Sequence, residues 1–373
     1  MATGTGHHLS PSQKVAWLRL IRTPGVGPQT FRQLVNRTGS AEAAIEALPR
    51  LAKRAGTSAS VPPASAAEDE IAALGKLGAR LVAIGEPDYP VLLGHISGAP
   101  PLLTVIGGPR IDSRRTVAIV GARNASAAGR KMTETIAREL GNRGYTTVSG
   151  LARGIDAAAH AASLDTGTVA VLAGGIDQLY PEENIPLGRS IVEHGGMLLT
   201  EMPLGWQPRA QDFPRRNRLV SGSSLGVVVV EAAKQSGSLI TARLALEQSR
   251  EVFAVPGSPL DQRSEGGNHL IQQGARLIAN AADIIDGLGT FDDREPAPLL
   301  EPDWDVTGGF EEDEPSLGDR ARLLEALSVA PVSIDALIGA TGLSVSAVQM
   351  LLLELDLQGR IEWSTGQLVA LKE

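Results

Sequence analysis

Polar residues that can hold an anion follow two short runs that read as strands near the middle of the chain, the apolar residues 117–120 and residues 146–148. Each run precedes a segment with helical spacing, and a helix that starts after a buried parallel strand points free backbone N–H groups at whatever lies there. We therefore predict an anion-binding edge, with two ordinary turns carrying surface arginines as the alternative. The candidate binding residues are Gly121, Arg123 and Ser126 after the first run, and Ser149, Gly150 and Arg153 after the second.

The loop after Gly121 departs from the dinucleotide-binding fingerprint. It continues as Ala122, Arg123, Asn124 and Ala125, with no second glycine to admit a pyrophosphate close to the backbone. A nicotinamide or flavin cofactor is thus disfavoured, and we predict no cofactor. A cationic side chain beside backbone donors suits the phosphates of a nucleic acid better.

A second basic cluster lies at residues 213–218 (FPRRNR), in what we expect to be a loop of the same sheet. Guanidinium groups grip phosphate, and an aromatic ring beside them can stack on a base. Trp206 lies just upstream, in a chain with only 3% aromatic residues, which favours binding over a solvated basic turn. The candidates are Arg209, Phe213, Arg215, Arg216, Asn217 and Arg218, joined by Lys234, Ser236, Gly237 and Ser238, where a glycine turn with hydroxyls opens a helix or merely caps it.

Asp156 and His160 are four residues apart, a spacing that places both on one helix face. Such a pair could hold a metal or act as acid and base. No third ligand or nucleophile is evident from the sequence. We expect no metal and no catalysis, and a hydrogen-bonded pair that fixes the loop at Ser149.

Short apolar runs alternate with helical patterns across residues 81–287, and each run ends in a loop rich in glycine, proline, acidic or hydroxyl residues. This alternation predicts an α/β fold with an extended Rossmann-like, doubly wound and mostly parallel sheet. The candidate residues above follow its strands, so they should meet at the carboxyl edge.

Two smaller modules flank the predicted sheet. Residues 1–80 read as helices joined by a glycine hairpin (residues 23–28), a helix-hairpin-helix or SAM-like pattern, and residues 1–85 carry ten basic against five acidic side chains. Residues 288–316 read as a flexible, acidic, proline-rich linker. Residues 317–373 have a winged-helix layout, but the third helix, near residues 344–357, contains two acids and no lysine or arginine. We therefore predict that this module does not read DNA, and that its spare apolar surface meets a protein or completes its own core.

The composition restricts the compartment and chemistry. The chain of 373 residues contains no cysteine, which excludes disulfides and thiolate chemistry and fits a reducing compartment. No apolar run approaches the ~20 residues that span a bilayer, and the first residues show no secretion signal. We expect a cytoplasmic protein without membrane contact.

Seven motifs in order resemble the DNA-processing protein A family, DprA or Smf. They cover about residues 87–285: VGAR at 120–123, SGLARGID at 149–156 with His160, GGID at 174–177 with Tyr180 and Pro181, FPRRNR at 213–218, SGSLITA at 236–242, VPG at 255–257 and GGN at 266–268. Some relatives have adjacent lysines upstream of the phenylalanine, where this chain has Arg209 and Ala210.

The resemblance implies a non-catalytic protein that binds incoming single-stranded DNA during natural transformation, protects it and loads the RecA recombinase. It also implies a homodimer formed through the Rossmann-like domain. Arg123 and the arginines of residues 213–218 would bind the strand, with Phe213 stacking on a base. The alternative is a nucleotide-binding or nucleotide-cleaving Rossmann enzyme, because the glycine turns could cradle a nucleoside phosphate.

Overall fold

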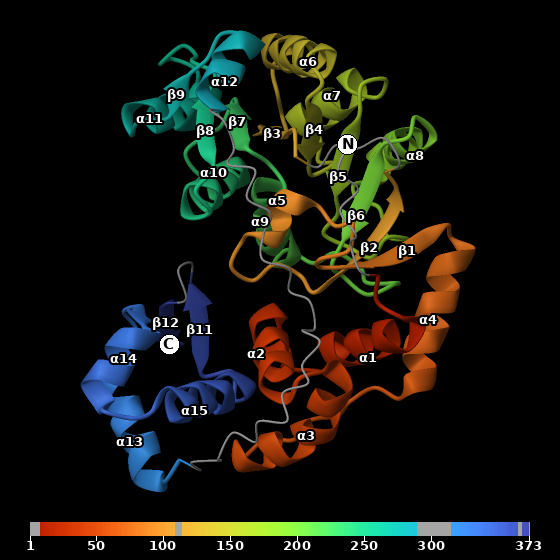
Figure 1. Cartoon of the computed structure of the whole chain (residues 1–373). Coiled ribbons are helices and arrows are strands. Elements are labelled where there is room, and N and C mark those ends of the chain that lie inside the picture. Colours follow the sequence, from red (N-terminus) through yellow and green to blue (C-terminus); the bar gives the residue numbers. More distant parts are fainter. Residues whose placement is uncertain (1–7, 109–113, 289–314, 365–367, 373) are drawn as a thin grey trace.

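The apolar runs of the central region form one sheet in the order β1-β2-β6-β5-β4-β3-β7-β8-β9 (Figure 1). The computed structural model describes residues 8–108, 114–288, 315–364 and 368–372. β2 pairs antiparallel with β1 and β6, and the other pairings are parallel. The predicted extended Rossmann-like, mostly parallel sheet is confirmed. Its strands are β1 (Ala79–Ala83), β2 (Leu102–Gly107), β3 (Thr116–Gly121), β4 (Thr146–Ser149), β5 (Thr168–Val171), β6 (Met197–Thr200), β7 (Gly226–Val230), β8 (Glu251–Ala254) and β9 (Arg276–Leu277).

Helices cover both faces of this sheet, which explains why its central strands are apolar on both sides. Val117 and Ile119 of β3 pack with α6 and α12, whereas Ala118 and Val120 join the core that includes α9 and α10. The elements of this region are α5 (Val91–Gly94), α6 (Ala127–Asn142), α7 (Ile155–Ala162), η1 (Glu182–Asn184), α8 (Ile185–Glu193), α9 (Asp212–Gly222), α10 (Gly237–Glu247), η2 (Gln262–Ser264), α11 (Glu265–Gln272) and α12 (Ala281–Leu288).

The basic hexamer does not lie in a loop, contrary to our prediction. Residues 213–218 form the first turns of α9, which begins at Asp212 with Pro214 near its N-terminus, where a proline's missing N–H costs nothing. The sequence pattern predicts a helix over only part of residues 217–221, because the run of charged residues masks the apolar face. The helical geometry turns successive arginines to different sides, so they cannot all face one ligand.

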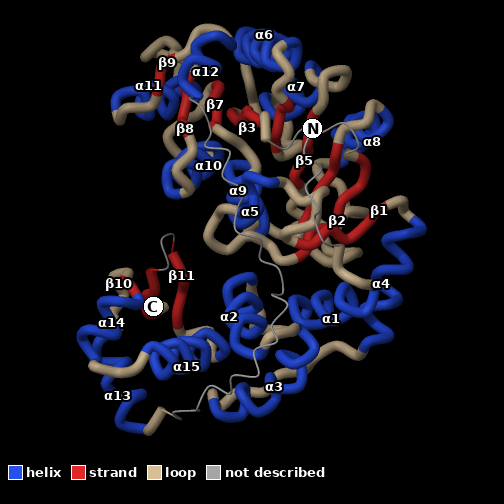
Figure 2. Tube along the Cα trace, in the orientation of Figure 1, coloured by secondary structure: helices blue, strands red, loops and turns tan. Residues whose placement is uncertain are grey.

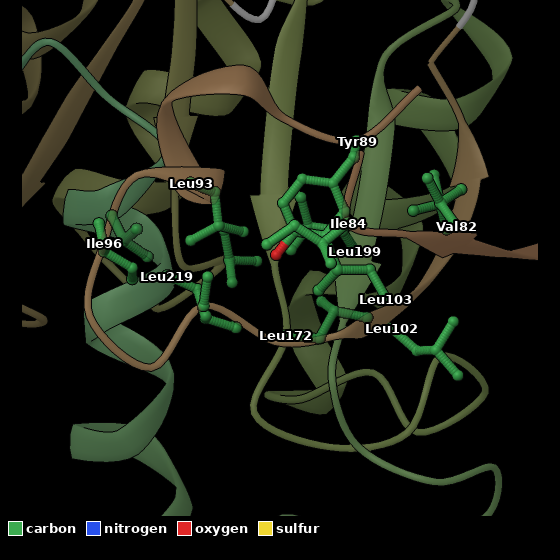
Figure 3. Close-up of a cluster of buried hydrophobic side chains, with 14 of the residues drawn as sticks. Val82, Ile84, Tyr89, Leu93, Ile96, Leu102, Leu103, Leu172, Leu199 and Leu219 are labelled. Atoms are coloured by element: carbon green, nitrogen blue, oxygen red, sulfur yellow. The ribbon is translucent and has the colours of Figure 1, made fainter. Parts of the chain in front are cut away.

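A buried cluster fixes α9 against the sheet (Figure 3). Leu219 of α9 packs with Leu93 and Ile96, next to the buried ring of Tyr89, in the same hydrophobic core as Leu103 and Leu199 of the sheet. The Tyr89 hydroxyl donates to the carbonyl of Pro100 at 2.7 Å, so the ring's polar end is satisfied. The position of the arginines on α9 is therefore set by a core that contains none of them.

Two smaller modules lie beside each other at one end of the sheet (Figures 1 and 2). The first contains α1 (Pro11–Arg22), α2 (Pro28–Thr38), α3 (Ala41–Arg54) and α4 (Ala64–Lys76), and α1 and α2 flank the predicted hairpin. The second is a winged-helix module made of α13 (Leu317–Ala326), β10 (Val332–Ser333), α14 (Ile334–Thr341), α15 (Val345–Leu357), β11 (Ile361–Ser364) and β12 (Leu368–Leu371). The predicted helical and winged-helix modules are confirmed.

Most of the predicted acidic linker, residues 289–314, lies outside the described residues. Among the described residues, no single helix is both long and apolar enough to cross a membrane. Taken together, α14 and α15 are long and apolar enough, but the two helices are separated by a break and bent by 115° relative to each other.

Candidate nucleic-acid interface

Arg123 and Phe213 meet at the carboxyl edge of the sheet, although 90 residues separate them in the chain. Arg123 follows β3 and is exposed, and its guanidinium carbon lies 5.6 Å from the centre of the Phe213 ring. Tyr180, whose exposed fraction is 51%, contacts Phe213 edge to face at 5.5 Å. The result is a guanidinium and two rings at one surface, which we name the stacking cluster: Arg123, Tyr180 and Phe213.

A second cation and ring lie just upstream of α9. The guanidinium carbon of Arg209 stands 4.2 Å from the centre of the Trp206 ring. Both residues are tied to Asp212, because the Trp206 indole donates to its carboxylate at 2.9 Å and the Arg209 backbone N–H donates at 2.8 Å. Asp212 therefore fixes the bend before α9, and Arg209 keeps an exposed cation there.

The three arginines of α9 have different environments. Arg215 is half exposed, and its Nε lies 3.0 Å from the Glu201 carboxylate. Arg218 is mostly buried, pairs with the same carboxylate and donates to the Gly98 carbonyl at 2.8 Å. Arg216 is buried, with an exposed fraction of 6%. Of these three, Arg215 is the one whose guanidinium can reach a strand without rearrangement.

Arg216 lies beneath the loop after β4. A Cβ at Gly150 would come within 2.0 Å of its guanidinium, so only glycine fits there. Arg216 donates to the Val171 carbonyl at the end of β5, while its Nε has no hydrogen-bond partner among the described residues. Burial lowers the pKa of Arg216 to about 10, so the group stays charged at neutral pH. This cation supports the loop from below.

Asp156 and His160 hold the same loop through its backbone. The Asp156 carboxylate accepts from the N–H groups of Gly150 at 3.1 Å and Ala152 at 3.3 Å. His160 accepts from Leu151 N–H through Nε2 at 3.3 Å and pairs with the Thr168 hydroxyl through Nδ1. Burial raises the pKa of Asp156 and lowers that of His160 to about 3, so the imidazole is neutral. The two residues fix the loop through separate bonds to its backbone, and not as the hydrogen-bonded pair that we predicted.

A carboxylate of the chain also occupies the start of α6. Glu231 follows β7 with a φ of 53°, a conformation that non-glycine residues seldom adopt. Its carboxylate accepts from the Ser126 N–H at 2.8 Å and from the Ser126 hydroxyl, and it lies against Gly129. The helix start that follows β3 is thus already filled by an anion, and Ser126 is engaged with it.

The remaining predicted residues are split between surface and interior. Arg153 is exposed and paired with Glu183, while Ser149 is buried and donates to the Ile119 carbonyl at 2.7 Å. Lys234 is exposed, 3.7 Å from Glu265. Asn217 reaches the Gly237 carbonyl at 3.3 Å, which joins α9 to the turn of Ser236 and Ser238 at the start of α10. A Cβ added at Gly121 would lie 1.9 Å from the Val230 carbonyl oxygen, so this glycine allows the close packing of the strands.

Sequence reasoning missed Tyr180 and Glu201 as parts of this interface. Tyr180 could have been found as an exposed aromatic residue in a chain poor in aromatics. Glu201 gave no signal, because its two arginine partners lie 14 and 17 residues further along the chain. Among the described residues there is also no group of three potential metal-ligating side chains.

Comparison with known proteins gives a consistent picture for all three modules. The family model for DNA recombination-mediator protein A matches residues 80–289, that for the DprA-like N-terminal HHH domain residues 11–73, and that for the DprA winged helix domain residues 311–367. Protein Smf of Escherichia coli is 38% identical over 317 residues, covering 83% of this chain and 82% of that protein. DNA processing protein DprA of Bacillus subtilis is 43% identical over 221 residues, covering 58% and 74%.

Two solved structures are also similar. DNA processing protein A from Streptococcus pneumoniae aligns with a TM-score of 0.62 at 30% identity, covering 76% of this chain and 100% of that one. DNA processing protein A from Helicobacter pylori, whose structure is described as giving insight into its single-stranded DNA binding mode, aligns with a TM-score of 0.51 at 30% identity, covering 56% and 95%. The first family model matches more than half of this chain, and the E. coli relative, at 38% identity, is covered over 82% of its own length. The chain therefore belongs to the DNA recombination-mediator protein A family, also called DprA or Smf.

Proposed function

We propose that this chain binds single-stranded DNA along the carboxyl edge of its sheet and acts in DNA processing during transformation, without catalysis. The stacking cluster carries this proposal. Arg123 is exposed and has no carboxylate partner among the described residues, whereas Arg153, Arg209, Arg215 and Arg218 are all paired. A guanidinium left over beside two rings can take a phosphate while the rings stack on a base.

The paired arginines can still contribute. Arg153 and Glu183 are both half exposed, and such a pair is worth at most about 1 kcal/mol, so a polyanion can compete for Arg153. The Arg209 and Arg215 side chains are also half exposed, although their carboxylate partners are buried. Arg216, Ser149 and Gly150 lie below this surface and support it. The names of the relatives, and the single-stranded DNA binding mode for which the H. pylori structure is described, agree with this reading.

The nucleotide-enzyme alternative is disfavoured by where the chain's own carboxylates lie. In Rossmann-like folds a nucleotide phosphate sits at the loops after the first strands. Here Glu231 occupies the start of α6 and Asp156 binds the N–H groups of the loop after β4. A nucleotide phosphate would have to displace a carboxylate at either place.

Further steps of the proposed role rest on family membership. These are protection of the incoming strand, loading of RecA recombinase and formation of a homodimer through the Rossmann-like domain. RecA loading and homodimer formation each add a protein partner, whereas protection follows from binding of the strand itself.

Fluorescence anisotropy tests the function. A labelled 30-nucleotide single strand should bind with micromolar or better affinity and a clear salt dependence, because arginine contacts release counterions. Duplex of the same length should bind more weakly, because its bases are not available for stacking. Equal affinity for both forms, or a nucleoside triphosphate that raises Tm while the single strand does not, would overturn the proposal.

A further inference from the structure

The third helix of the winged-helix module, α15, is buried on two opposite sides. Val348, Leu351 and Leu352 face the module's own core. Met350 and Leu353, which are 4% and 2% exposed, belong instead to the core of the N-terminal domain, with Trp17 and Phe31. The spare apolar surface predicted from the sequence is therefore covered by the N-terminal domain of the same chain. Figure 1 shows α15 lying beside α2 and α3.

The two acids of α15 take part in this contact. Glu354, whose side chain is 4% exposed, accepts from Arg54 Nε at the end of α3 at 3.1 Å and also pairs with Arg320 of its own module. Asp356 accepts from the Thr30 hydroxyl of α2 at 2.6 Å, and the Gln358 side chain donates to the Ala55 carbonyl. The two acids from which the sequence predicts that this helix does not read DNA therefore form polar contacts with the N-terminal domain.

The end of α15 also abuts the hairpin between α1 and α2. A Cβ placed on Gly25 would lie 3.9 Å from the Leu357 carbonyl. A carboxylate and a helix C-terminus, both negative, therefore stand against the turn of a domain with net positive charge. A phosphate backbone that approaches this exposed turn is repelled by them.

We propose that the winged-helix module is an intramolecular cap, whose occupant is the N-terminal helical domain of the same chain, and that docking shields this basic domain from nucleic acid. In the capped state α15 is a protein-binding helix and cannot enter a DNA groove. Undocking releases Arg54 from Glu354 and moves an acidic module away from a domain with net positive charge, so affinity for nucleic acid rises on opening.

The interface can be opened by a substitution that leaves the module's own core intact. Leu353→Glu places a charge where α15 meets the N-terminal domain, and in the undocked module the same side chain is solvated. Val345→Glu is the matched control, because Val345 is on the same helix and 54% exposed. Arg54→Glu opens the interface from the other side by setting a like charge against Glu354.

Small-angle scattering and anisotropy on the full chain decide the matter. Leu353→Glu should increase the radius of gyration and raise single-strand affinity several-fold, while Val345→Glu matches the unsubstituted protein. Arg54→Glu should also increase the radius of gyration, with a smaller gain in affinity because it removes a cation from the basic domain. Adding Gly27→Asp, which puts a negative charge in the exposed hairpin without a clash, should remove the gain. An unchanged radius in both opening variants would overturn the docking, and opening without a gain in affinity would overturn the shielding.

Discussion

The carboxyl edge of the sheet and the α15 interface both pair arginines with carboxylates, but they end with different surfaces. At the sheet edge the carboxylates of Glu201, Asp212 and Glu231 are bonded to other groups of the chain. Arg123 is left exposed in the stacking cluster. At α15 the acids are matched by Arg54, Arg320 and Thr30, and the helix is covered on both sides. The charge that remains after internal pairing, rather than the motif, decides which surface can meet a polyanion.

The largest expected effect tests the apolar side of this comparison. Leu353→Ala should lower the free energy of unfolding by about 2 to 5 kcal/mol, because a buried leucine leaves a cavity. Val345→Ala, on an exposed position of the same helix, should change it by less than about 0.5 kcal/mol. Chemical denaturation measures both, and equal small effects would show that α15 is not packed on the N-terminal domain.

The next largest effect is on DNA binding and comes from removing Arg123, which has no carboxylate partner among the described residues. Arg123→Ala should weaken single-strand binding by about 1 to 3 kcal/mol, since a charge-assisted bond and its stacking partner are lost together. Arg138→Ala removes the same charge from an exposed position of α6 and serves as the control. If the two variants bind alike by anisotropy, the stacking cluster is not the DNA contact.

A pH dependence follows from the loop beneath that surface. The folded-state pKa of His160 is about 3, well below its usual 6.5, so the unfolded chain takes up the proton first as pH falls. Stability from this residue is therefore complete above about pH 6.5 and declines towards pH 3, by up to about 1.4 kcal/mol per pH unit. Asp156, whose pKa burial raises, acts in the opposite direction.

The contribution of His160 is separated by a substitution. His160→Gln keeps a side-chain acceptor but cannot titrate, so its Tm should fall less steeply between pH 7 and pH 5 than that of the unsubstituted protein, whatever its absolute Tm. A parallel pair of curves would show that the imidazole does not stay neutral.

The smallest effect concerns the carboxylate that restrains two arginines. Glu201→Gln removes the carboxylate partner of Arg215 and Arg218. Because the Arg215 side chain is already 51% exposed to solvent, single-strand affinity should rise by less than about 1 kcal/mol. Arg218 is anchored by a carbonyl as well, so the gain comes through Arg215. Arg215→Ala in the same background should cancel it, and persistence of the gain would assign it elsewhere.

The sequence by itself determined the order and type of most elements, because helical and strand periods are local properties. Residues 117–120 read as a buried strand from their apolar run alone, and the motifs around Arg123 and residues 213–218 carried the family resemblance. The helix at 213–218 was misjudged, since its N-terminal charges hide the apolar face that Leu219 completes.

Only the tertiary structure decided which of these residues are available for binding. Arg216 is buried under Gly150, Arg218 is held by Glu201, and Ser126 is bonded to Glu231, which is 105 positions away in the chain. Met350 and Leu353 of α15 are covered by the N-terminal domain, although the sequence pattern leaves them as spare apolar surface. Pairing and burial depend on contacts between segments far apart in the chain, and the residue spacing that predicts helices and strands gives no information about those contacts.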